Sequence, residues 1–222
     1  SADGWISLGR NEVPSFRNHP IPGAGGPSPM IAAFWDDLKT GSGGDVYSYA
    51  TNDYVVIQWD YMRTYDNNSR ETFEIILYNN EENPTITGDN EIKIQYYDFN
   101  NTSSGYYPVA GTPTHGCYST IGIENHLGDQ GLQYSFNNQY PTAAMPLSDG
   151  DALFITTGRA SYTAGDLNQD GSINVLDVVT LVNIVLNVIE PTPIQLMAAD
   201  INDDGLLNVL DVVLIVNLAL GN

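Results

Sequence analysis

A duplicated segment near the C-terminus constrains the fold more than any other feature of the sequence. Its two copies read GDLNQDGSINVLDVVTLVNIVL from Gly165 and ADINDDGLLNVLDVVLIVNLAL from Ala199, an offset of 34 residues. In each copy a polar stretch rich in Asp and Asn precedes apolar residues at helical spacing. The repeat therefore predicts two loop–helix units, with helices over 174–188 and 208–220, the second ended by Gly221.

The apolar residues of the two predicted helices exceed what one small core can bury. The first stripe comprises Val178, Leu181, Val182 and Val185, and the second Val212, Ile215, Val216 and Ala219. Beyond these stripes, Val179, Ile184 and Leu186, with their counterparts Val213, Leu218 and Leu220, are also apolar. We expect part of this apolar surface to pack against the β-sandwich expected over residues 1–158, or against another subunit.

Each polar stretch has the spacing of a twelve-residue calcium loop. Calcium prefers six to eight oxygen ligands, and glycine at position 6 permits the sharp turn of such a loop. Gly171 and Gly205 occupy that position. Positions 1, 3, 5, 7, 9 and 12 hold Asp166, Asn168, Asp170, Ser172, Asn174 and Asp177 in the first copy, and Asp200, Asn202, Asp204, Leu206, Asn208 and Asp211 in the second. Position 7 contributes only a backbone carbonyl, so Leu206 is compatible with a bound ion.

Two features limit this interpretation. Position 12 is Asp where the usual loop has Glu, so the shorter side chain must approach the ion more closely to bind it with both oxygens. Acidic turns before helices can also act only as helix caps. Two complete copies, each with its glycine and following helix, favour two calcium ions over capping alone.

The charge distribution points the same way. The formal net charge is −20, from 7 Lys and Arg against 27 Asp and Glu. All basic residues lie between Arg10 and Arg159, so the carboxylates of residues 160–222 have no internal counter-charge. Such an acidic chain repels nucleic acid and anionic membranes. It also lacks an apolar run that could span a bilayer, so we expect no nucleic-acid partner and no membrane insertion.

The paired loops resemble the type I dockerin family, in which D-x-N-x-D-G-x-[IVL]-N-x-x-D loops each precede one helix. Both copies fit this pattern over about residues 164–222. The resemblance implies two calcium ions, calcium-dependent folding and a secreted bacterial or archaeal protein. In that family loop positions 10 and 11 and the helix faces dock onto cohesins. Here those positions are Val175-Leu176 and Val209-Leu210, which suit a cohesin-like partner and suit packing against the chain's own sandwich equally well.

Residues 1–158 have a different pattern, typical of β-strands. Segments rich in β-branched and aromatic residues alternate with turn clusters such as Gly41-Ser42-Gly43-Gly44. The predicted strands cover 46–49, 54–59, 72–78, 91–97, 118–124 and 152–156. Successive strands without intervening helices indicate an antiparallel sandwich or barrel. We therefore predict a mainly β chain, an antiparallel β-sandwich over 1–158 followed by a small α-helical calcium-binding domain over 164–222.

Six segments of this region carry a second resemblance. They read DGWISLG, PSPMIAAFWDDL, DYVVIQWDYM, ETFEIILY, NEIKIQYYD and STIGIENHLGDQGLQY. Together they are similar to a nidogen-like extracellular β-domain of secreted bacterial multidomain proteins. This resemblance implies an extracellular location and a sandwich architecture, without an activity.

Three further sites are weighed against ordinary structural roles. Asp36-Asp37 could bind a third cation, although such a pair more often caps a turn. The three tryptophans and fourteen tyrosines could form a sugar-binding platform, although strand tryptophans are usually core. Cys117 lies near His115 and His126 and is a conceivable nucleophile, but a lone cysteine in a strand is usually a small core residue. We expect no enzyme.

Domains that resemble this one usually carry strands before the segment DGWISLG, and Ser1 stands directly ahead of that segment. A sandwich without these strands would expose an edge and an apolar groove, which either an upstream segment or a strand of another molecule could fill. The leading hypothesis is thus an extracellular, calcium-binding assembly protein, a filament or surface-layer building block joined by strand addition or dockerin contacts. The alternative is a cohesin- or carbohydrate-directed targeting module of a larger secreted peptidase or glycoside hydrolase.

Overall fold

The computed structural model describes residues 1–9, 11, 15–23, 25–41, 43–104, 118–158 and 162–221. The chain divides into two compact units. We call the first, Ser1–Leu77 with Ile92–Ile155, the sandwich. We call the second, Tyr78–Glu91 with Thr156–Asn222, the helical module.

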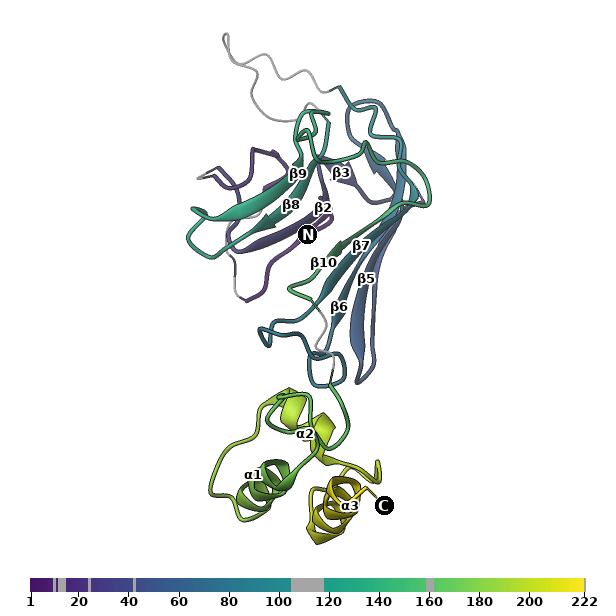
Figure 1. Ribbon diagram of the computed structural model, residues 1–222. Helices are drawn as coiled ribbons and strands as arrows, with labels where there is room; N and C mark the ends of the chain where they lie inside the picture. The colour runs from purple at the N-terminus through teal and green to yellow at the C-terminus, as the bar shows by residue number, and fades with distance from the viewer. Residues whose placement is uncertain are drawn as a thin grey trace. The chain divides into compact units, whose positions relative to one another are not determined.

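The sandwich consists of two mainly antiparallel sheets (Figure 1). The smaller sheet has the strand order β1 (Trp5–Ile6), β2 (Met30–Trp35), β8 (Thr120–Glu124) and β9 (Gly131–Ser135). The larger sheet has the order β10 (Ala152–Ile155), β7 (Ile92–Asp98), β6 (Arg70–Tyr78), β5 (Tyr54–Thr64) and β3 (Leu38–Lys39), and β4 (Asp45–Ala50) also pairs with β5. The predicted β-sandwich is therefore confirmed.

Inward side chains of both sheets form one aromatic core. Phe73 of β6 stacks on Phe34 of β2 and on Trp59 of β5, with ring centroids 5.5 and 5.1 Å apart. The buried Tyr96 hydroxyl of β7 donates a 2.8 Å hydrogen bond to the Ala33 carbonyl of β2. This bond satisfies a polar group that would otherwise be costly to bury, and it ties the two sheets together.

Glycine is required where the chain enters β1. Gly4 has φ +75°, and a Cβ atom there would lie 1.9 Å from the Phe34 carbonyl oxygen. That close approach lets the Gly4 carbonyl accept 3.0 Å hydrogen bonds from the amides of Ala33 and Phe34. The DGW segment therefore closes one edge of the smaller sheet.

All six predicted strands are present, with shifted ends, and four more accompany them. β1 and β3 have two residues each, too few for a periodic pattern. All six residues of β2 are buried, because Met30, Ala32 and Trp35 pack in a second cluster with Trp5 while Ile31 and Ala33 face the main core. A strand buried on both faces shows no alternation of apolar and polar residues. β9 begins at a glycine and is half-exposed.

The helical module contains three helices: α1 (Val175–Val185), α2 (Pro193–Ala199) and α3 (Val209–Ala219). α1 and α3 are the two predicted helices, and they contact each other. Gly221 has φ +74° just beyond α3, as expected for a residue that ends a helix, and Asn187 with φ +54° occupies the same place after α1. α2, which the apolar pattern did not predict, begins with a capping box formed by Thr192 and Gln195.

The core of the helical module is small. It comprises Leu167, Leu181, Ile184, Ala199 and Ile215. The predicted stripe is partly correct, since Leu181 and Ile215 are fully buried, and Val178, Val185 and Val212 pack against them half-buried. Ile184 was expected outside the stripe, yet it is only 6% exposed, whereas its counterpart Leu218 is 40% exposed. The two copies are therefore alike in sequence but not equivalent in packing.

Candidate calcium loops and docking face

Hydrogen bonds bring the six oxygen-bearing positions of the first loop together. Asp166 accepts hydrogen bonds from the amides of Asp170 (3.1 Å) and Gly171 (2.9 Å), which folds the loop around its first carboxylate. The Asn168 side-chain amide donates to Asp170 Oδ2 at 2.9 Å. The Asn174 side-chain amide donates to the carbonyl of Ser172 at 3.1 Å. These contacts link positions 1, 3 and 5 and, separately, positions 7 and 9.

The carboxylate at position 12 connects the beginning and the end of the first loop. Asp177 Oδ1 accepts hydrogen bonds from the amides of Leu167 (2.9 Å) and Asn168 (3.0 Å), and Oδ2 accepts one from the amide of Asn174 (2.9 Å). Asp177 is fully buried and also completes the capping box of α1 with Asn174. Capping is therefore one real role of this residue, as the alternative interpretation of the sequence held.

The second loop repeats this arrangement 34 residues further on. Asp200 accepts from the amides of Asp204 (3.2 Å) and Gly205 (2.8 Å), and the fully buried Asp211 accepts from Ile201 (3.1 Å) and Asn208 (3.0 Å). The contact from Asn202 to Asp204 (2.7 Å) and that from Asn208 to the Leu206 carbonyl (3.1 Å) also recur. The repeated sequence thus gives a repeated loop geometry.

Glycine is needed at position 6 of both loops. Gly171 and Gly205 have φ +84° and +76°, in the left-handed region that glycine adopts without a Cβ clash. No other heavy atom lies within 4 Å of a Cβ built at either residue. The glycines are therefore required by the backbone turn rather than by crowding.

The donor set fits a calcium ion. Each loop offers three carboxylates, two side-chain amide oxygens and one carbonyl, the hard oxygen ligands that calcium prefers. Asp177 and Asp211 are fully buried and Asp166 is 5% exposed, and residues 160–222 contain no Lys or Arg to compensate them. Buried carboxylates need a counter-charge or several hydrogen bonds. Among the described residues, however, no group of three or more His, Cys, Asp or Glu side chains is arranged to hold a metal. The loop carboxylates bind backbone amides instead.

A second feature of the module is an apolar face that α1 and α3 expose. Its members in the first copy are Val175, Leu176, Val179 and Leu186, which are 67, 57, 52 and 65% exposed. Their counterparts Val209, Leu210, Val213 and Leu220 are 65, 56, 53 and 70% exposed. We call these eight residues the docking face. Clustered exposed apolar residues commonly mark an interaction surface.

The remaining candidate residues have structural roles where they are described. Trp5, Trp35 and Trp59 are at most 6% exposed, so the tryptophans are core residues, as favoured from the sequence, and take no part in a surface platform. Asp36 is 1% exposed and accepts a 2.8 Å hydrogen bond from the Asp37 amide, and burial raises its pKa to about 7. His115 and Cys117 lie outside the described residues, and His126 is exposed.

The molecule is thus a β-sandwich joined to a module of paired loop–helix repeats. Residues 1–163 match the family model described as NIDO related, and residues 164–218 match the type I dockerin domain. Because the first match covers most of the chain, the protein belongs to the NIDO-related family, and it carries a type I dockerin domain. Both resemblances expected from the sequence are confirmed. No curated protein and no solved structure matches the chain.

These matches establish the coarse character of the chain. Type I dockerin domains bind calcium and dockerin domains bind cohesins, and such modules occur in extracellular proteins. Both matched domains are non-catalytic modules. None of the helices in the described part of the chain is long and apolar enough to cross a membrane.

Proposed function

We propose that this protein is a non-catalytic, secreted assembly protein whose helical module docks onto a cohesin-like partner. One calcium ion in each loop holds the loop and the following helix in the docking geometry. The proposed ligands are Asp166, Asn168, Asp170, the Ser172 carbonyl, Asn174 and Asp177 for one ion, and Asp200, Asn202, Asp204, the Leu206 carbonyl, Asn208 and Asp211 for the other.

The observation that carries the proposal is the matched exposure of the docking face. Each of its four residue pairs differs by at most five percentage points in exposed fraction between the copies. The match is not general among apolar residues of the repeat, since Ile184 is 6% exposed and its counterpart Leu218 is 40% exposed. The helices therefore keep their outer apolar side chains exposed in both copies even where the inner packing differs. This pattern supports an external partner for the face.

A double substitution tests the docking. Val179→Asp with Val213→Asp introduces one charge at the centre of each half of the docking face. We expect the dissociation constant for a bound type I cohesin to rise about a hundredfold, because burying an unpaired carboxylate is costly. Calcium affinity, measured by titration calorimetry, should change little, since neither side chain is a proposed ligand.

The matched control is Asn187→Asp with Asn217→Asp. Asn217 lies one turn from Val213 and Leu220, and Asn187 follows Leu186. A second control, Asn52→Asp with Asn138→Asp, therefore adds the same two charges at exposed positions of the sandwich, outside the docking face. A panel of recombinant type I cohesins, immobilised for surface plasmon resonance with calcium present, provides the probe. Equal loss in the second control, or undiminished docking of the Val179→Asp/Val213→Asp protein, would contradict the assignment of this face.

A second candidate function is self-assembly by strand addition into a filament or surface layer. The supporting observation is an apolar pocket of about 370 Å³ in the sandwich, lined by Leu8, Met30, Ile31, Ile92, Ile123 and Leu132 among others. Leu8 and Leu132 are both 58% exposed, and β9 is an edge strand. An apolar pocket beside an edge strand favours an added strand from a second copy. Electron microscopy of native material tests this candidate, since regular polymers would support it and a monodisperse monomer would exclude it.

A further inference from the structure

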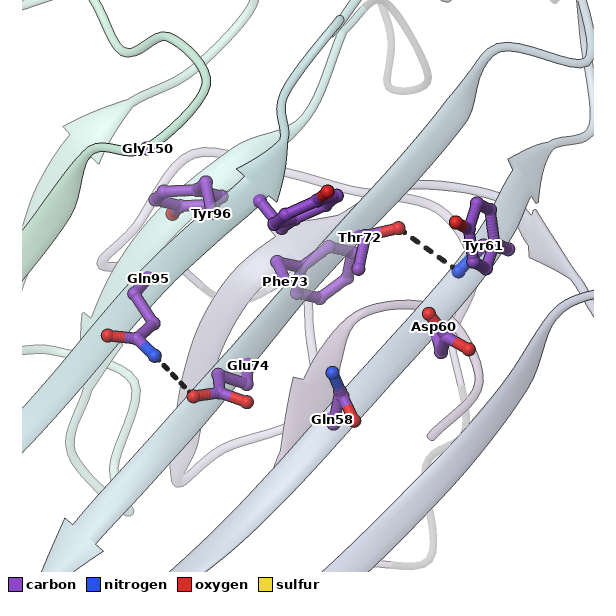
Figure 2. Close-up of a pocket in the computed structure, with 10 residues that line it drawn as sticks. Gln58, Asp60, Tyr61, Thr72, Phe73, Glu74, Gln95, Tyr96 and Gly150 are labelled. Carbon is purple, nitrogen blue, oxygen red and sulfur yellow. Dashed lines mark hydrogen bonds between the residues drawn. The ribbon is translucent and has the colours of Figure 1, made fainter.

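The outer face of the larger sheet contains a pocket that no core or docking role explains. It has a volume of about 520 Å³, within the usual range for small-ligand sites. Figure 2 shows its lining side chains, which come mainly from β5, β6 and β7. The lining residues are Gln58, Asp60, Tyr61, Thr72, Phe73, Glu74, Gln95, Tyr96, Tyr97 and Gly150. Since Trp59, Phe73 and Ile94 are buried in the core, their strand neighbours lie on the opposite, outward face.

Two irregular strands turn tyrosines into this pocket. In β5, the buried Trp59 and Met62 enclose two outward residues, Asp60 and Tyr61, and Tyr61 has φ +51°. A non-glycine residue in this left-handed region is strained. This backbone conformation therefore costs conformational free energy, and it places the Tyr61 side chain on the outer face.

β7, on the other side of β6, is also irregular. The register of β6 and β7 shifts where Thr72 pairs with Asp98 and Phe73 pairs with Tyr96, which leaves Tyr97 as the extra residue of a bulge. Tyr97 is 73% exposed. Bulges beside sites commonly redirect a side chain. Each strand flanking β6 thus presents one tyrosine next to one aspartate.

Thr72 connects the two bulges. Its Oγ1 donates to Asp98 Oδ2 at 3.1 Å and accepts a 3.2 Å hydrogen bond from the Tyr61 amide. Thr72 is 4% exposed although it belongs to the outward row of β6, so it forms the floor between the tyrosines. The hydrogen bonds of Thr72 therefore connect the Tyr61 segment of β5 to the Asp98 end of β7.

The described polar side chains that line the pocket combine donors and acceptors and include no cation, and Arg70 lies against the lining residue Tyr61. Glu74 accepts a hydrogen bond from the Gln95 side chain, and the amide of Gln58 comes from the neighbouring strand (Figure 2). The lining includes two carboxylates and no Lys, Arg or His, which disfavours phosphate, sulfate or uronate ligands. The Arg70 guanidinium lies over one face of the Tyr61 ring, 4.9 Å from its centroid, and the Tyr61 side chain is still 42% exposed.

We propose that this pocket binds a neutral saccharide chain through stacking on Tyr61 and Tyr97 and hydrogen bonds to the side chains between them. A pyranose ring offers an apolar C–H face to an aromatic ring and hydroxyl groups that both donate and accept, which suits amides mixed with carboxylates. A cationic amine could donate to the carboxylates but could not accept hydrogen bonds from the amide N–H groups. The observations therefore favour a sugar.

The outer face extends beyond the pocket in a way that suits a chain rather than one ring. Tyr47 of β4 is 54% exposed and pairs with Gln58, and Glu74 pairs with Gln95. These residues form a row across four neighbouring strands. At about 4.8 Å per strand, the row extends about 14 Å across the sheet.

The test uses the full chain with calcium present and a panel of soluble probes: cellopentaose, xylopentaose, mannopentaose, maltopentaose and chitopentaose. We expect at least one probe to bind in titration calorimetry, and Tyr97→Ala to weaken it about tenfold. Tyr65→Ala is the matched control, because Tyr65 is 61% exposed but lies outside the pocket lining. Its affinity should equal that of the unaltered chain.

Tyr61→Asn separates a binding role from a structural one. Asparagine tolerates left-handed backbone better than tyrosine, so thermal stability should hold while saccharide affinity falls about tenfold. Three outcomes would overturn the proposal: no probe bound at millimolar concentration, equal loss in Tyr65→Ala, or binding of tetramethylammonium that competes for the same site. The proposal concerns the sandwich alone, so failure of cohesin docking leaves it standing, and failure here leaves the docking proposal standing.

Discussion

The sandwich and the helical module are stabilised in opposite ways. The sandwich buries Trp35, Trp59, Phe34 and Phe73 almost completely, and large aromatic residues contribute strongly to core stability. The core of the helical module has five buried aliphatic residues and no aromatic one. Its loops also concentrate carboxylates without a basic side chain in residues 160–222. We therefore expect the sandwich to fold by apolar burial and the helical module to depend on a bound cation.

Removal of calcium should produce the largest difference between the two units. At free calcium about 100 times the dissociation constant, each ion stabilises a fold by about 2.7 kcal/mol, so two contribute about 5 kcal/mol. That is the size of a whole small domain's stability. In excess chelator we expect the circular dichroism of α1 and α3 to be lost while the near-ultraviolet signal of the buried tryptophans persists. Helical circular dichroism that is unchanged in chelator would refute the calcium sites.

Acidification should change the stability of the two units in opposite directions: the sandwich should gain stability and the helical module should lose it. Burial raises the pKa of Asp36 from 3.8 to about 7 and that of Glu71 from 4.5 to about 7, the latter against three hydrogen bonds from Ser69, Asn100 and Asn101. Between pH 4 and 7 the folded sandwich then binds more protons than the unfolded chain. Its stability is therefore greatest near pH 4 and falls as the pH rises through 7. Calcium ligands must be deprotonated, so the helical module should weaken as the pH falls.

Asp36→Asn isolates this effect from the general repulsion of an acidic chain. The Asn side chain keeps the oxygen that accepts from the Asp37 amide but cannot ionise. We expect the variant to gain about 3 kcal/mol relative to the unaltered chain at pH 8 and little at pH 4. Glu71→Gln is the contrasting change, because Asn100 and Asn101 donate to different oxygens of Glu71, so the Gln NH2 group would face one of these two backbone N–H donors and destabilise the sandwich at either pH. Denaturant titration of the tryptophan signal measures both. An equal gain at pH 4 and pH 8 would contradict the assignment to Asp36.

The two copies within the helical module give a smaller contrast. Ile184→Ala should cost about 3 kcal/mol, because Ile184 is in the core, whereas Leu218→Ala should cost about 1 kcal/mol at 40% exposure. Thermal unfolding of the helical signal with calcium saturating compares them. Equal costs would mean that the copies pack symmetrically in solution.

How far the sequence predicted these features depends on the region. The loops could be predicted residue by residue, because calcium loops have a fixed ligand spacing and a glycine at position 6. The copy 34 residues away repeats both features. The burial of Ile184 could not, since the closely similar apolar pattern of α3 leaves Leu218 40% exposed. Tertiary packing, absent from the local pattern, decides which side of a mostly apolar helix is covered.

In the sandwich, segments rich in β-branched and aromatic residues located six of the ten described strands but not the pocket. Tyr61 and Tyr97 are two of fourteen tyrosines, and only the bulges show that they leave the alternating pattern together. The sequence contains one weak signal. In Trp59-Asp60-Tyr61-Met62 and in Tyr96-Tyr97-Asp98-Phe99, an adjacent aspartate and tyrosine stand between two core-type residues, which breaks the strict alternation of a strand. The tryptophans, the more conspicuous aromatic residues, are core.

The smallest predicted effect concerns backbone strain within a strand of the sandwich. Among the described residues of the helical module, non-glycine residues with positive φ occur only in the loops and just beyond a helix. At Tyr61, glycine would adopt φ +51° without a Cβ clash, so Tyr61→Gly relieves strain of about 1 kcal/mol or more. The variant loses the stacking of Arg70 on the ring, worth about 0.5–1 kcal/mol at an exposed site. The hydrogen bond from the residue 61 amide to Thr72 remains. We therefore expect a net gain of about 0.5 kcal/mol in denaturant titration, against a loss of about 1 kcal/mol for Tyr97→Gly, where a glycine weakens a strand whose backbone is not in the left-handed region. A loss at Tyr61 as large as that at Tyr97 would show that the backbone there is not strained, and would remove the conformational argument for a binding role of this tyrosine.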